Sequence, residues 1–163
     1  MIGEESELLS SKPLGGLMIS MIETFSLKKV CLEFFDHERE TASPNSSLLD
    51  RQVRLHGNES EFLYISWTWE RQKGPNDPHY SIGINKDSFF NSPPCFEIDA
   101  SSSDLWSGLV GQEISLEFLD PDSQILQVKS PQSVIYCYTW GVDTVSISGT
   151  DPRQGGNNSA EGL

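Results

Sequence analysis

Cysteine is scarce in this sequence and lacks the spacings that signal a disulfide framework or a zinc site. The three cysteines, Cys31, Cys95 and Cys137, are an odd number and form no CxxC pair. Isolated cysteines of this kind are typical of small buried side chains in a reducing compartment. We therefore predict a cytoplasmic protein with no disulfide-stabilised fold.

Basic residues are also few. The 163 residues include 11 Lys and Arg against 24 Asp and Glu, which gives a formal net charge of −13. Between Asp87 and Asp151 the only basic residue is Lys129, although this stretch holds ten carboxylates. A field of this sign opposes approach to phosphate backbones and to anionic lipid headgroups. The charge predicts no binding to nucleic acid or membrane, and it favours a basic protein as partner.

Long apolar runs are missing. No stretch approaches the roughly 20 apolar residues that a helix needs to span a bilayer. Glu4, Glu5 and Glu7 stand where an export signal carries basic residues, and Gly15 and Gly16 interrupt the apolar run that follows. Neither a membrane span nor an export signal is predicted.

Familiar catalytic motifs are absent as well. The sequence contains no GxSxG, no GxxxxGK[ST] and no HExxH, and its three histidines share no ligand spacing. The densest polar cluster runs from Asp36 to Glu40, and mixed charges on a predicted loop are usually solvated. We therefore predict a non-catalytic protein without a cofactor or bound metal. A metal-assisted hydrolase using Asp36, Glu38 and Glu40, or Asp120 and Asp122, is an alternative.

A regular alternation of apolar and polar residues is present near the C-terminus. Ile114, Leu116 and Phe118 alternate with polar residues, and Asp120-Pro121-Asp122 supplies a turn. Four such strands, joined by connections of about four residues, pair most simply as neighbours. We predict an antiparallel meander over 112–149.

Similar alternation upstream predicts a mainly β fold. A first strand is expected over 25–34, with a bulge or late start at Lys28 and Lys29. Trp67 and Trp69 share a face with Leu63, which favours a place in the core. The prediction is a single antiparallel β-sandwich or partly open barrel of about 7–9 strands that ends in the four-stranded meander. Ser103 and the apolar residues that follow it predict one short helix near 103–110.

Composition divides the chain into three parts. Residues 1–22 are expected to be a poorly ordered lead, 23–149 a single mostly β domain, and 150–163 a disordered tail rich in Gly and Asn. One core is expected because domains average about 150 residues.

These features favour an acidic interaction domain that docks a basic partner through its C-terminal half. An inhibitor or immunity-type protein of a bacterial kind has this character, because opposed charge speeds encounter and aromatic side chains anchor the complex. A small-ligand or carbohydrate-binding β module, using Trp140 and the loop 71–79, is the first alternative. The sequence predicts no oligomeric state. The predicted partner-binding residues are Glu113, Glu117, Asp120, Asp122, Trp140 and Asp143.

Overall fold

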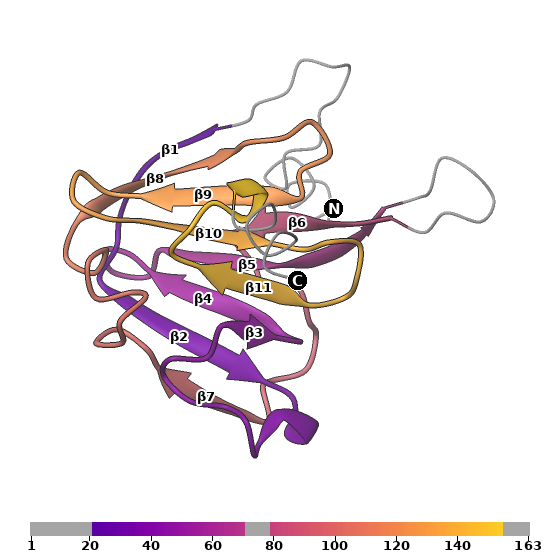
Figure 1. Ribbon diagram of the computed structural model, residues 1–163. Coiled ribbons are helices and arrows are strands. Elements are labelled where there is room, and N and C mark those ends of the chain that lie inside the picture. Colours follow the sequence, from indigo (N-terminus) through magenta and orange to yellow (C-terminus); the bar gives the residue numbers. More distant parts are fainter. Residues whose placement is uncertain (1–20, 71–78, 155–163) are drawn as a thin grey trace.

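Two antiparallel sheets face each other in a sandwich-like arrangement in the computed structural model, which describes residues 21–70 and 79–154 (Figure 1). The six-stranded sheet has the order β1 (Met21–Ser26), β8 (Glu113–Phe118), β9 (Ile125–Lys129), β10 (Val134–Tyr138), β11 (Val145–Ser148) and β3 (Leu48–Leu49). The five-stranded sheet has the order β6 (His79–Asn85), β5 (Phe62–Glu70), β4 (Gln52–His56), β2 (Lys29–Phe34) and β7 (Phe96–Asp99). A mainly β sandwich is confirmed, with eleven strands in the described ranges.

The C-terminal meander is also confirmed. β8, β9, β10 and β11 are consecutive neighbours, with Leu116 opposite Val128 and Cys137 opposite Leu126. Ile114, Leu116 and Phe118 are buried on the inner face, as the alternation requires.

Two strands from the N-terminal part of the chain pair with the two edge strands of the meander and extend its sheet to six strands. β1 pairs with β8, and the two-residue β3 pairs with β11. The intervening strand β2 belongs to the five-stranded sheet, so the chain passes between the sheets more than once.

The single strand expected over 25–34 is two strands in different sheets. β1 ends at Ser26 and β2 begins at Lys29. The interruption of the alternation at Lys28 and Lys29 therefore marks the point where the chain crosses from one sheet to the other. Leu27 lies at the crossing, and its side chain is fully buried. Its backbone N–H donates to the Gln112 carbonyl and its carbonyl accepts the Gly111 N–H, so it forms these hydrogen bonds and not those of a β-ladder. The register irregularity in this region falls earlier, within β1.

The helix expected near 103–110 is wrong; this segment is a series of hydrogen-bonded turns. Bonds of the i to i+4 type, such as Ser107 N–H to the Ser103 carbonyl, alternate with shorter i to i+3 bonds. The predicted cap is present, because the Trp106 N–H donates to Ser103 Oγ at 3.4 Å. Gly108 lies so close to the Ser133 side chain that an added Cβ would be 2.1 Å from its Oγ, and this close packing fixes an irregular path.

One apolar core fills the space between the sheets. Val30, Leu32 and Phe34 of β2 face it from the five-stranded sheet, and the turn segment contributes the fully buried Trp106. The segments outside the strands include η1 (Asp36–Glu38), the loop 86–95, and residues 150–154, where Pro152 is buried.

Parts of the predicted lead and tail lie outside the described residues, namely 1–20 and 155–163. Met21 and Ile22 are already in β1. In the described ranges, no helix has the length and apolar character needed to cross a membrane.

Candidate functional site

Large apolar side chains are exposed at one end of the sandwich. Among the described residues, the exposed large hydrophobics are Leu48, Trp69, Trp140 and Val142, each 50–55% accessible. Figure 1 shows the β8–β9 and β10–β11 turns and the adjoining ends of β5 and β6 on the same side of the molecule. We call Trp69, Trp140 and Val142, together with Asp122 and Asp143 of the two turns, the aromatic end. Leu48 lies elsewhere, in β3, where it lines the pocket described below.

Direct contacts hold the aromatic end together across the two sheets. The Trp69 ring lies 5.2 Å from Tyr80 in an edge-to-face arrangement. The Tyr80 carbonyl accepts a bond from the Gln124 side chain at 3.3 Å, and the Gln124 carbonyl accepts the Thr139 N–H at 3.0 Å. Thr139 directly precedes Trp140, so a continuous path joins the two exposed indoles.

The β10–β11 turn presents Trp140 in a defined position. Thr139 Oγ1 donates to the Val142 carbonyl at 2.6 Å and accepts the Val142 N–H at 3.3 Å, which closes the turn. Gly141 has φ +87°, a conformation that residues with a Cβ rarely adopt. The Tyr138 and Trp140 rings pack at 5.4 Å. Trp140 is 55% exposed at this position.

The two aspartates of the β8–β9 turn have different roles. The Asp120 carboxylate accepts the Gln124 N–H at 2.9 Å and the Ile125 N–H at 2.9 Å, so it closes its own turn. Asp122 is exposed at the tip. Arg153 is close to Asp120 but is paired with Asp151 at 2.8 Å. Asp122 is therefore the carboxylate of this turn that is free to meet a partner.

Glu113 and Glu117 lie on β8 and not in the turns. Both are on the outer face of β8, and Glu113 begins the strand at its far end, beside Lys129 and Ser130. At about 3.3 Å per residue, Glu113 is some 13 Å from Glu117. Of the predicted set, Asp122, Trp140 and Asp143 are thus in the two turns of the aromatic end, and Asp120 closes one of these turns.

Trp69 was expected in the core and is instead part of the aromatic end. Its neighbour Trp67 is partly buried, and the Trp67 indole N–H donates to the Asp50 carbonyl at 2.9 Å. The alternation that places Leu63 and Ile65 inside continues to the end of β5, where Trp69 packs against Tyr80 and stays 54% exposed. Of the loop 71–79 predicted for ligand binding, residues 71–78 lie outside the described residues, and His79 begins β6.

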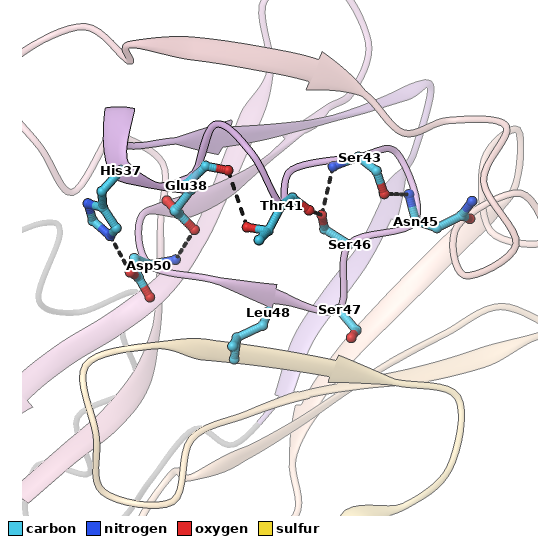
Figure 2. Close-up of a pocket in the computed structure, with 9 residues that line it drawn as sticks. All are labelled: His37, Glu38, Thr41, Ser43, Asn45, Ser46, Ser47, Leu48 and Asp50. Atoms are coloured by element: carbon cyan, nitrogen blue, oxygen red, sulfur yellow. Dashed lines mark hydrogen bonds and ion pairs between the residues drawn. The ribbon is translucent and has the colours of Figure 1, made fainter.

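A second polar site lies around η1. Figure 2 shows a pocket of about 490 Å³ with His37, Glu38 and Asp50 at one end and hydroxyl-bearing side chains along the rest. His37 Nε2 and Asp50 Oδ2 are 2.6 Å apart. This hydrogen bond and the nearby carboxylates raise the pKa of His37. The lining hydroxyls are those of Thr41, Ser43, Ser46 and Ser47.

Asp36 and Glu40 do not join that group. The Asp36 carboxylate pairs with Arg39 at 2.9 Å on the surface, and Glu40 is exposed. In the described ranges, the one group of three metal-ligating side chains is His37, Glu38 and Asp50, whose ligand atoms all lie within 4.8 Å of one another. The sequence did not indicate that Asp50 belongs to this group, because Asp50 follows Glu38 by 12 residues. The loop before β4 brings it close to His37 and Glu38.

The burial expected of the three cysteines is confirmed for two of them and is wrong for Cys95. Cys31 and Cys137 are buried, and Cys95 is exposed. Burial raises the pKa of Cys137 to about 12, so its thiol stays protonated at neutral pH. Burial also raises the pKa of Cys31.

Comparisons with protein-family models, with curated proteins and with solved structures find no match to this chain.

Proposed function

We propose that the protein is a non-catalytic, acidic interaction domain that docks a basic protein partner through the aromatic end. The observation that carries this proposal is the gathering of Trp69, Trp140 and Val142, all about half exposed, beside Asp122 and Asp143. Exposed apolar groups gathered with charged neighbours are typical of protein-binding surfaces.

Charge supports a basic partner. Over 119–144, Lys129 is the only basic residue, and it ends β9 on the side away from the turns. Arg153, which approaches the β8–β9 turn, is already paired with Asp151. A net charge of −13 steers a basic protein toward this surface and raises its rate of association.

The aromatic side chains would contribute most of the binding free energy. Tryptophan is enriched among the residues that dominate binding free energy, and Trp140 is held by a closed turn, so little conformational entropy is lost when it is covered. An inhibitor or immunity-type protein that blocks a basic nuclease or toxin is the kind of protein that such a surface fits.

The test is capture of a stoichiometric basic partner on the immobilised full chain at physiological salt, followed by affinity measurement with the two purified proteins. Trp140→Ala should weaken binding by roughly 2 kcal/mol or more, as expected for an anchor residue. The double variant Asp122→Asn, Asp143→Asn should slow association and reduce its dependence on salt.

A charge-matched control is Glu40→Gln, Glu113→Gln, which removes two carboxylates elsewhere on the surface. It should bind nearly as well as the unmodified chain. The proposal is abandoned if no stoichiometric basic partner is recovered, or if the control weakens binding as much as the double variant at the turns.

A second candidate is a carbohydrate- or small-ligand-binding module. The observation that favours it is the exposure of the flat Trp69 and Trp140 rings, since aromatic faces bind sugar rings. A panel of saccharides that quenches the fluorescence of the unmodified chain, but not that of Trp140→Ala, would favour this function over protein docking.

A further inference from the structure

We propose that His37, Glu38 and Asp50 form a binding site for one divalent transition-metal ion, with Zn²⁺ as the reference ion. Each side chain offers one ligand atom, and the three atoms all lie within 4.8 Å of one another. The group comes from two segments, η1 and the connection from β3 to β4.

The donor set selects the class of ion. One imidazole nitrogen with two carboxylate oxygens is a combination that zinc takes in proteins, whereas magnesium and calcium take oxygen ligands almost exclusively. The two carboxylates also neutralise the charge of a divalent ion, so the loaded site carries no net charge when His37 is neutral.

Glu38 is held in place for this role. It is buried, and its two carboxylate oxygens accept the backbone N–H groups of Phe35 and Asp50, each at 2.8 Å. A carboxylate offers about four lone-pair sites, so each oxygen keeps one for a metal. Ligating carboxylates that are fixed by hydrogen bonds bind metals more tightly than mobile ones.

His37 and Asp50 need to separate only slightly. Their facing atoms are 2.6 Å apart, which is the distance of a short hydrogen bond. Ligand atoms at about 2.1 Å from a tetrahedral ion are about 3.4 Å apart. The His37 side chain is 66% exposed and can make this shift of less than about 1 Å by a small rotation, while its ring stays near Phe35.

The pocket provides the fourth position. With three protein ligands, a tetrahedral ion keeps one position for water or another small ligand. His37, Glu38 and Asp50 line the same pocket of about 490 Å³, and its remaining lining is mostly hydroxyl and amide groups (Figure 2). That polar lining suits an ion-bound water and its hydrogen bonds.

The test is calorimetric titration of the full chain with ZnCl₂ at pH 7.5, with MgCl₂ and CaCl₂ as comparison ions. We expect uptake of one equivalent of zinc, with at least tenfold weaker binding of the other two ions. His37→Gln and Asp50→Asn should each weaken zinc binding about tenfold or more. Asp50→Asn keeps the backbone N–H that supports Glu38, so the loop should stay folded.

Asp36→Asn is the matched control. It makes the same chemical change in the same loop, but the Asp36 carboxylate pairs with Arg39 and is outside the group. Its zinc affinity should stay within about twofold of the original, because a surface carboxylate contributes only through screened charge. Absence of zinc uptake overturns the proposal, as does equal loss in Asp36→Asn and Asp50→Asn, or full uptake by His37→Gln.

A second measurement covers a variant that folds poorly. Zinc should change the ¹⁵N shift of one imidazole nitrogen of His37 in the unmodified chain, and it should raise the Tm of that chain but not of Asp50→Asn. An unchanged His37 resonance in the presence of one equivalent of zinc would also overturn the proposal.

Discussion

The Glu33 carboxylate and the Arg51 guanidinium form an ion pair in which both side chains are almost completely buried. Arg51 Nε lies 3.2 Å from Glu33 Oε1, and the same oxygen accepts the Gln52 side-chain amide at 2.7 Å. Arg54 binds the other oxygen of Glu33 and extends the network outward to Glu97. Glu33 is therefore the acceptor on which three buried or half-buried donors converge.

Glu33→Gln should be strongly destabilising. The change leaves Arg51 charged and buried without its counter-ion, and loss of one member of a buried pair costs about 3–5 kcal/mol. Urea denaturation measures the free energy of unfolding. Glu97→Gln is the control, because Glu97 pairs with Arg54 at 45% side-chain exposure and its loss should cost below about 1 kcal/mol. Equal losses in the two variants would contradict this account.

Asp120 and Asp122 should separate stability from binding. Asp120→Ala removes the acceptor of the Gln124 and Ile125 N–H groups and should lower the free energy of unfolding by about 1–3 kcal/mol. Asp122→Ala, at an exposed tip, should change stability by less than about 0.5 kcal/mol. Denaturation and partner affinity measured on both variants check the prediction, since Asp122 should have the larger effect on association rate. A neutral Asp120→Ala would exclude its role in closing the turn.

Stability should fall in mild acid through His56. Burial lowers the pKa of His56, and the positive charges of Arg54 and Lys29 act in the same direction against the opposing Glu97 and Asp99. The unfolded chain therefore binds a proton at His56 near pH 6.5, before the folded chain does, and stability is lost as pH falls through and below that value.

His56→Gln isolates this contribution. Arg54 Nε donates to His56 Nε2 at 3.0 Å, and a glutamine amide keeps an acceptor there without a titrating group. The free energy of unfolding, measured at pH 7, 6 and 5, should fall more steeply for the original chain than for the variant. Parallel curves would show that His56 makes no such contribution.

Trp106 should tolerate phenylalanine better than alanine. The side chain is fully buried, so Trp106→Ala leaves a cavity and should cost about 3–5 kcal/mol. Its indole N–H has no acceptor among the described residues, so Trp106→Phe removes an unsatisfied donor along with some volume. Urea denaturation of both variants is the measurement, and equal costs would contradict the difference in packing.

The meander was predictable because each of its strands shows one buried and one solvated face. Ile114, Leu116 and Phe118 alternate with polar residues over the whole of β8, and the Asp120-Pro121 turn fixes where the chain reverses. The crossing at Leu27 was not predictable, because Lys28 and Lys29 interrupt the alternation in a way that fits a bulge as well as a change of sheet. The buried residues on either side, Phe25 and Val30, are both apolar although they belong to different sheets. A two-residue strand such as β3 is too short to show an alternation of apolar and polar residues, so the sequence could not predict it.

The helix predicted near 103–110 does not form because of a contact with a distant part of the chain. The spacing of Leu105, Trp106 and Leu109 fits a helix, but Gly108 packs against Ser133 of a distant turn, and that tertiary contact overrides the local pattern. The sequence of residues 103–110 alone cannot predict that contact.

The candidate sites were predictable only in part. Asp122, Trp140 and Asp143 were identified because turn residues are exposed almost by definition. Trp69 was missed because alternation identifies a face of a strand but not where the opposite sheet stops covering it. Asp50 was missed because its approach to His37 depends on the path of the loop between η1 and β4.

β1 leaves the ribosome long before its pairing partner exists. Roughly 90 residues separate the end of β1 from β8, and at about 5–20 residues per second their synthesis takes about 5–18 s. All strands of the five-stranded sheet lie between Lys29 and Asp99, so that sheet is complete on the nascent chain first. Its apolar inner face is then exposed until the meander, which ends about 50 residues later, has been synthesised in a further period of about 2–10 s. The nascent protein should be most vulnerable to aggregation and most in need of chaperones in that interval.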